Sequence, residues 1–165
     1  KKNIKKFFLS VYWYESLGQK NTSIKKNNFK LLVIKSKHAI KENILGNYFK
    51  KHPSKLERLK KRYYFLVLIN KKKILSSGWI YFGSRWKITE IEKSIPLENR
   101  TLLFDFETPR QLRNRGYYRL LLKLIRRKFV NKKLAIYSLS NNTRSNRAIK
   151  KAGFKFIKKI HGLRN

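Results

Sequence analysis

The stretch that decides the fold reads LFDFETPRQLRNRGYYRLLL and covers residues 103–122. It begins inside a predicted strand, Thr101–Glu107, which is rich in aromatic and branched residues. A period of two predicts two faces for this strand, with Leu102, Phe104 and Phe106 opposite Leu103, Asp105 and Glu107. Pro109 begins a helical zone, in which apolar residues recur at helical spacing: Tyr117, Leu120, Leu121, Leu124, Ile125 and Phe129.

The loop between that strand and that helix, Arg113–Tyr118, has the composition of an anion-binding site. Backbone N–H groups at a helix N-terminus attract negative charge, and Gly116 lets the backbone approach a phosphate closely. Arg113 and Arg115 add positive charge that suits a diphosphate. A basic loop with one glycine is common, however, and a solvated helix start is the alternative interpretation.

Other parts of the chain make this loop more specific. Arg113 and Gly116 match the Gln/Arg-x-x-Gly-x-Gly/Ala motif with which the GNAT superfamily binds acetyl-CoA. Residues 142–145 match a downstream Asn-x-x-Ser/Ala element, and Gly153-Phe154 matches the pair that closes the next helix in that family. Because these elements stand in the right order on the right predicted structure, the chain resembles the GNAT superfamily.

The resemblance implies a fold of the α/β (α+β) class, a GNAT-type mixed, largely antiparallel central sheet with flanking helices and strands splayed at a cofactor cleft. A single domain, 1–165, would consist of a variable N-terminal half, 1–61, and a cofactor-binding core, 62–160. The hydrophobic pattern predicts further strands: Phe7–Tyr14, Phe29–Ile34, Tyr63–Ile69, Ile74–Phe82, Lys133–Leu139 and Phe154–Ile160. Trp86–Ile91 is expected to extend the sheet.

Helix signals occur in both halves of the chain. Ser54 and Glu57 have the spacing of a capping box, which predicts a short basic helix from Ser54 to about Lys61. Ala39–Tyr48 is ambiguous and could be helical. A further helix is expected downstream, with Asn142 or Thr143 as its N-cap and Gly153 just after its end.

Acetyl-CoA is the cosubstrate that the resemblance implies, bound in a cleft between strands 102–108 and 133–139. Strand-edge groups around residues 106–108 would pair with the pantetheine, and the loop would hold the pyrophosphate. The start of the downstream helix would lie near the pantetheine or the thiol. The cofactor-binding residues implied in this way are Phe106, Thr108, Arg113, Asn114, Arg115, Gly116, Tyr117, Tyr118, Asn142 and Ser145.

The resemblance also implies direct acyl transfer, in which an amine attacks the thioester, backbone donors stabilise the oxyanion and a base takes up the amine proton. Asp105 and Glu107 are the expected catalytic carboxylates, because they share a strand face in a chain with only eight acids. Either could instead form a salt bridge or bind a cationic substrate.

Two positions depart from the family pattern. Tyr118 replaces the last small residue of the phosphate motif. Ile149 stands four residues before Gly153, where many members have a tyrosine that acts as general acid. Another group, such as Tyr137 or Tyr117, would then protonate the departing thiolate, or the thiolate leaves without help.

The amino-acid composition of the chain excludes several classes of site and of protein. The chain has 165 residues, of which 41% are hydrophobic, and this suits one domain with a core. It has no cysteine, which excludes disulfides and thiolate metal sites, and its three histidines are far apart, so we expect no metal. Its apolar runs are too short for a transmembrane helix. The apolar stretch near its start soon meets Glu15 and no small-residue cleavage site follows, which favours a strand over a signal peptide, so we expect a cytoplasmic protein. The chain holds no Met and could begin inside a longer product.

The net charge of +35 has two interpretations. It could serve weak, non-specific binding of a polyanion, or it could reflect biased lysine usage along the whole chain. The function that the resemblance implies is that of an acetyl-CoA-dependent N-acetyltransferase, which we expect to be monomeric or homodimeric and to act on an amino sugar or another small amine. Two alternatives stay open: the same fold acetylating a protein or aminoacyl amine, and a non-catalytic basic protein that binds nucleic acid.

Overall fold

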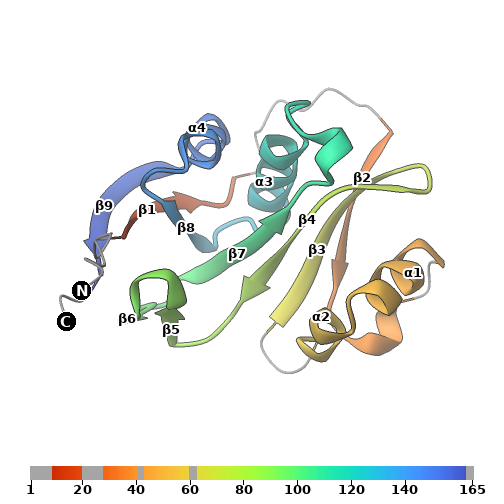
Figure 1. The fold of residues 1–165 in the computed structure, drawn as a ribbon, viewed down its shortest axis with the longest axis horizontal. Helices are drawn as coiled ribbons and strands as arrows, with labels where there is room; N and C mark the ends of the chain where they lie inside the picture. Colours follow the sequence, from red (N-terminus) through yellow and green to blue (C-terminus); the bar gives the residue numbers. More distant parts are fainter. Residues whose placement is uncertain (1–8, 20–27, 41–42, 60–62, 163–165) are drawn as a thin grey trace, which may run out of the picture.

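A seven-stranded mixed sheet forms the centre of the molecule (Figure 1). The computed structural model describes residues 9–19, 28–40, 43–59 and 63–162. Strand neighbours are antiparallel except for β7 and β8, which are parallel. In spatial order the strands are β2 Phe29–Ile34, β3 Tyr63–Asn70, β4 Lys73–Tyr81, β7 Thr101–Glu107, β8 Lys133–Leu139, β1 Ser10–Leu17 and β9 Lys155–His161.

Helices cover both faces of the sheet (Figure 1). On one face lie α3, Tyr117–Lys128, and α4, Thr143–Lys151. On the other lie α1, Asn43–Lys51, and α2, Pro53–Glu57. Three short 3₁₀ turns complete the connections: η1 Lys37–Ala39, η2 Thr89–Ile91 and η3 Arg110–Leu112. The predicted α+β class with a largely antiparallel mixed sheet is therefore confirmed.

The strand β3 shows how the sheet depends on both helical layers. Leu66 and Leu68 join the core cluster under α3 and α4, while Phe65, Val67 and Ile69 join the cluster under α1. All five are buried, and burial of one such side chain contributes roughly 1.5–3 kcal/mol. A strand buried on both faces has an uninterrupted apolar sequence, which is the pattern that predicted it.

The segment Trp86–Ile91 does not extend the central sheet, contrary to expectation. Within the described residues, β5 (Arg85–Ile88) pairs only with β6 (Lys93–Pro96), in a separate two-stranded sheet. Ile88 and Ile91 are buried in a cluster with residues of β1, β7 and β8. The apolar pattern therefore arises because this segment packs on the face of the sheet and not at its edge.

The predicted capping box at Ser54 is wrong. Helix α2 begins one residue earlier, with His52 as N-cap and Pro53 in the first turn, and His52 makes no capping hydrogen bond through its side chain. Proline suits the first helical position because that position needs no N–H partner. The helix ends at Glu57 and not near Lys61, a residue that lies outside the described ranges.

The predicted signals at the two ends of α4 are present in the structure. The Asn142 side chain caps α4 by accepting a hydrogen bond from the Ser145 N–H over 3.1 Å. Gly153 follows the C-cap of that helix with φ of 95°, a left-handed conformation that favours glycine. Within the ambiguous segment Ala39–Tyr48, the residues from Asn43 onward belong to α1, Ala39 ends η1, and residues 41–42 lie outside the described ranges.

A β-bulge interrupts β7 opposite Gly78. The flanking register pairs are Trp79 with Phe104 and Ser77 with Glu107, so two residues of β7 face one residue of β4. The first of the two, Asp105, has φ of 50°. The ring of the second, Phe106, occupies the space that a side chain at Gly78 would need. Glycine at position 78 therefore permits the bulge.

The bulge makes the predicted faces of β7 wrong, because an extra residue reverses the alternation beyond it. Phe106 packs on the same side as Leu103, in the cluster with α3. Phe104 lies on the opposite side. Asp105 and Glu107 share a side, as expected, but it is the side of the α2 segment, to which both form ion pairs.

Candidate active site

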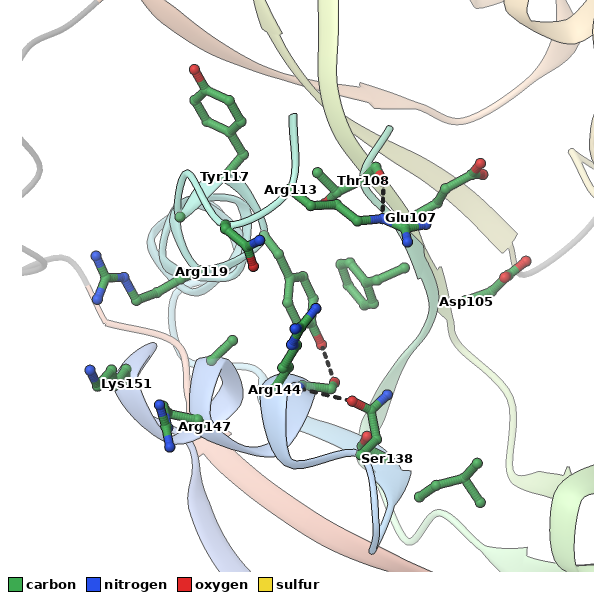
Figure 2. Close-up of a pocket in the computed structure, with 18 of the residues that line it drawn as sticks. Asp105, Glu107, Thr108, Arg113, Tyr117, Arg119, Ser138, Arg144, Arg147 and Lys151 are labelled. Atoms are coloured by element: carbon green, nitrogen blue, oxygen red, sulfur yellow. Dashed lines mark hydrogen bonds between the residues drawn. The ribbon is translucent and has the colours of Figure 1, made fainter. Parts of the chain in front are cut away.

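The strands β7 and β8 separate and leave a cavity between them (Figure 2). Their parallel pairing is limited to residues 101–103 and 134–136. The cavity has a volume of about 920 Å³ and is lined by the ends of both strands, the loop before α3, and one face of α4. The strands are therefore splayed where the sequence predicted a cleft. All ten predicted cofactor-binding residues and both predicted catalytic carboxylates line it.

The loop before α3 has the backbone geometry of an anion-binding site. Asn114 and Gly116 are both left-handed, with φ of 63° and 79°, and no described side chain caps the N-terminus of α3. Successive N–H groups in such a loop form a concave surface that attracts anions. The Arg113 Nε donates a hydrogen bond to the Thr108 carbonyl oxygen over 3.1 Å, which holds the loop against the end of β7.

Tyr118 lies inside the cleft between β7 and α4. Its ring centroid is 5.2 Å from that of Phe106, and its hydroxyl oxygen is 3.5 Å from the Ser145 Oγ. Burial raises the pKa of Tyr118 far above its usual range. Ile149, one turn further along α4, is fully buried in the core. The Tyr118 hydroxyl of α3 therefore lies beside α4, the helix on which many GNAT proteins carry a tyrosine at the position that Ile149 occupies here.

Tyr137 on β8 is a second buried hydroxyl in the cavity wall. It accepts a hydrogen bond from the Trp86 Nε1 over 3.3 Å. The pKa of Tyr137 is raised to about 12, mainly by burial and to a smaller extent by the nearby carboxylates of Glu90 and Asp105. Because the indole N–H can only donate, the Tyr137 proton is left for another acceptor, and the Glu90 carboxylate is close enough to take part in such a hydrogen bond.

Tyr117, the other tyrosine considered as a proton donor, has a different position. Its ring packs against Phe29 with centroids 6.1 Å apart. Figure 2 shows its hydroxyl pointing away from Ser138 and Arg144. The main chain of Tyr117 begins α3 directly after this loop, but its side chain does not point into the cleft.

Asp105 and Glu107 lie on the α2 side of β7 and are both ion-paired. Asp105 pairs with Arg58, and the Glu107 Oε2 lies 2.7 Å from the Lys55 Nζ. The hydrogen bond from Lys55 lowers the pKa of Glu107. Burial alone would lower the pKa of Lys55, but its hydrogen bonds to Glu107 and Tyr48 outweigh this and raise it. Both carboxylates therefore hold the α2 segment against the sheet through ion pairs, which is the salt-bridge alternative considered for them in the sequence.

Glu90 is an acid of the cavity wall that the sequence did not single out. Among the described carboxylates it alone has no Lys or Arg within 4.0 Å, and its Oε2 accepts a hydrogen bond from the Thr89 hydroxyl over 3.3 Å. The turn η2 brings it to the cavity near Tyr137. No local motif marks this position, because the contact arises from the fold.

Four further cations of the cavity wall were also missed in the sequence: Arg119 on α3 and Arg144, Arg147 and Lys151 on α4 (Figure 2). All four are exposed. The three on α4 are three and four residues apart, so a helical period already places them on one face.

Two negative findings concern the described residues only. No group of three His, Asp or Glu side chains in that part of the chain is placed to hold a metal ion. No helix there combines the length and the apolar character needed to cross a membrane.

Solved structures of low sequence identity share this architecture. A conserved protein of unknown function from Staphylococcus epidermidis aligns with a TM-score of 0.63 at 9% identity, over 93% of this chain and 60% of its own. A protein assigned to the GNAT family of acetyltransferases from Novosphingobium aromaticivorans aligns with a TM-score of 0.56 at 12% identity, over 96% of this chain and 66% of its own. This chain thus spans less than two thirds of either protein.

The aminoglycoside N-acetyltransferase AAC(6')-Iy, solved in complex with CoA, is similar in length. It aligns with a TM-score of 0.54 at 13% identity, over 83% of this chain and 98% of its own. No protein-family model and no curated protein sequence matches the chain. Likeness at such identities concerns the fold: this chain has the fold of the GNAT acetyltransferases.

Proposed function

We propose that this chain is an N-acetyltransferase that moves an acetyl group from acetyl-CoA to an amine by direct attack. The observation that carries the proposal is the cavity between β7 and β8, one wall of which is the anion-binding loop Arg113–Gly116. A likeness in fold to a transferase solved with CoA supports the choice of this cosubstrate.

The residues of the cavity suit the parts of acetyl-CoA. The pantetheine arm carries two amides, which can pair with a strand edge, and β7 beyond residue 103 is no longer paired with β8. Phe106 and Thr108 would flank the arm on one side, and Asn142 and Ser145 on the other. The loop from Arg113 to Tyr118 would bind the pyrophosphate through its N–H groups and arginines.

Bound acetyl-CoA supplies a thioester whose carbonyl carbon a neutral amine can attack. The bulge leaves Asp105 and Phe106 outside the one-to-one register with β4, and we assign a backbone N–H of this pair to the thioester oxygen. Tyr137 or Tyr118 would donate its proton to the sulfur as the carbon–sulfur bond breaks. Both hydroxyls are protonated at neutral pH, since the pKa of an ordinary tyrosine is about 10 and burial raises both values further.

The amine must lose its proton to a carboxylate, directly or through water. Asp105 and Glu107 remain candidates, although each is already neutralised by a cation and the lowered pKa of Glu107 makes it a weaker base. Glu90 joins them, since no cation within the described residues pairs with it. We expect Asp105→Asn, Glu107→Gln and Glu90→Gln, compared side by side, to identify the base by loss of turnover at normal CoA affinity.

The acceptor that we favour is a small amine such as an amino sugar. Trp86, Tyr81 and Phe104 form an aromatic group near the splayed strands, with Trp86 and Phe104 centroids 4.5 Å apart. An aromatic surface can stack on a sugar ring, and this supports an amino sugar. A monomer or homodimer and a cytoplasmic location, where acetyl-CoA is available, complete the proposal.

The decisive experiment measures CoA release. Because the chain has no cysteine, a thiol reagent added to the purified protein and acetyl-CoA reports only the CoA that is set free. We expect amine-dependent thiol release and a rise in melting temperature with acetyl-CoA, because a ligand that binds only the native state stabilises it. An unchanged melting temperature at millimolar acetyl-CoA would falsify the proposal.

A panel of acceptor amines distinguishes the small-molecule acceptor from the alternative functions. Glucosamine, a peptide with a free N-terminus and an aminoacyl ester are compared in the same assay. Faster release with the peptide or the ester would replace the small-molecule acceptor by a macromolecular one. Salt-sensitive RNA binding without any thiol release would favour the non-catalytic alternative.

A further inference from the structure

A second cationic surface of the cavity lies on α4, apart from the loop before α3. It consists of Arg144, Arg147 and Lys151, here called the α4 cationic face, and all three side chains line the cavity. Figure 2 shows Arg147 and Lys151 on the same open side of the site as Arg119 of α3. Two elements of the fold thus bring cations to a single place.

The charges of this face are uncompensated within the described residues. No carboxylate there lies within 4.0 Å of any of the three side chains, and α4 itself contains no acid. Acids are scarce in this chain, which has 43 Lys and Arg but only eight Asp and Glu. What these three share is one face of α4 in the wall of the cavity, to which Arg113, Arg115 and Arg119 also contribute.

The positions on the helix make this arrangement unfavourable without a ligand. Arg147 and Lys151 are four residues apart, where like charges repel. Arg144 lies in the first turn of α4, where a positive charge opposes the helix dipole. An anion bound between α3 and α4 would relieve both effects, so the face is arranged for a negatively charged ligand.

Counting charges indicates which anion. The pyrophosphate of CoA carries about two negative charges, and the loop offers Arg113 and Arg115 together with its N–H groups. The ribose of CoA carries a third phosphate, a monoester with a charge of about −1.5 to −2 at neutral pH. This group needs cations other than those of the loop.

We propose that Arg147 and Lys151, with Arg119 and Arg144 beside them, bind the 3′-phosphate of CoA. The α4 cationic face then makes the site selective for thioesters of CoA over otherwise identical thioesters that lack this phosphomonoester. The inference rests on the proposed function, since it assumes that the loop holds the pyrophosphate of the same molecule.

Calorimetric titration with CoA and with dephospho-CoA, which differs only in lacking the 3′-phosphate, tests the proposal. The full chain is compared with the double variant Arg147→Gln, Lys151→Gln, and with Lys150→Gln as the control. Lys150 is an exposed cation on α4 that does not line the cavity. The wild type should bind CoA about tenfold or more tightly than dephospho-CoA, because charge-assisted hydrogen bonds are the strong ones.

The double variant should lose most of this difference while its affinity for dephospho-CoA stays the same, and Lys150→Gln should keep the difference. Added salt should reduce the difference, since exposed charges are screened. Equal affinity of the wild type for both ligands overturns the inference. A double variant that binds both ligands more weakly by the same factor also overturns the inference, because that result indicates a general electrostatic attraction of anions and not a site for the 3′-phosphate. Binding of neither ligand to the wild type is a different result, since it removes the proposed function itself.

Discussion

Gly116 has a conformation that only glycine adopts easily. Its φ of 79° is left-handed, and a left-handed conformation costs another residue about 1–2 kcal/mol. We expect Gly116→Ala to lower the free energy of unfolding by about that amount, measured by chemical denaturation. A methyl group on the proposed phosphate-binding surface should also weaken CoA binding roughly tenfold, or about 1.4 kcal/mol.

Gly46→Ala is the matched control for this change. Gly46 lies within α1, and a side chain there would meet no atom within 4 Å. Alanine should therefore stabilise the protein by about 0.5–1 kcal/mol and leave CoA binding unchanged. If Gly116→Ala binds CoA as tightly as Gly46→Ala does, the loop does not hold the pyrophosphate.

Glu90 offers a test of the acceptor side that leaves the cofactor side alone. Without a neighbouring cation among the described residues, it is available to an ammonium group. We expect Glu90→Gln to raise the KM for the amine roughly tenfold while the Kd for CoA is unchanged, measured by thiol release and calorimetry. Glu92→Gln is the control, because Glu92 is exposed and paired with Lys87 at 2.7 Å. Equal effects of the two changes would show that only surface charge matters.

Among the elements, α3 and α4 are joined by one buried arginine. Arg126 of α3 donates a hydrogen bond to the Ala152 carbonyl oxygen at the end of α4 over 2.8 Å, and another to the Gln19 Oε1 over 3.2 Å. Burial lowers its pKa. Arg126→Ala should cost about 2–3 kcal/mol in chemical denaturation, because α4 loses a charged partner for its last carbonyls.

Arg127→Ala is the control for Arg126→Ala, since the neighbouring side chain is exposed and should change stability by less than about 0.5 kcal/mol. Similar losses for both variants would contradict a capping role for Arg126. Amide exchange in α4 should accelerate in Arg126→Ala alone.

The elements could largely be predicted from the sequence, since strands buried on both faces and amphipathic helices leave periodic patterns. The errors have local causes. Asp105 introduces a bulge with no apolar signal of its own, and Pro53 displaces the expected start of α2. The position of the loop before α3 in the cavity wall could be predicted because its residues are contiguous. Glu90 could not, because it meets the cavity only after η2 has folded over the sheet.

At the scale of the whole molecule, the charge of +35 sets the response to pH and salt. Ion pairs with Lys55 and Arg100 lower the pKa values of Glu107 and Glu98. A carboxyl group whose pKa is lowered by folding stabilises the folded protein fully when the pH is above the pKa of that group in the unfolded chain, about 4.5. This stabilisation is lost as the pH falls through the lower pKa of the folded state.

We therefore expect the melting temperature to decrease when the pH is lowered below about 4.5. We also expect it to increase with added salt at every pH, because salt screens the repulsion among like charges. Thermal melts across a pH series at two salt concentrations measure both effects. Glu107→Gln should show a shallower decrease at acid pH. A melting temperature that falls with salt would mean that attractive ion pairs outweigh the net charge.

The position of β1 has a consequence for the order of folding. Among the described strands Ser10–Leu17 comes first in sequence, yet its partners there are β8 and β9, the last two: Val11 lies opposite Leu139 and Ile160. On the ribosome, β1 emerges long before its partners exist, and non-local pairing of this kind is slow. The half of the sheet formed by β8, β1 and β9 can therefore close only after synthesis has passed residue 160, and until then the apolar strand β1 lacks both partners and is exposed to aggregation.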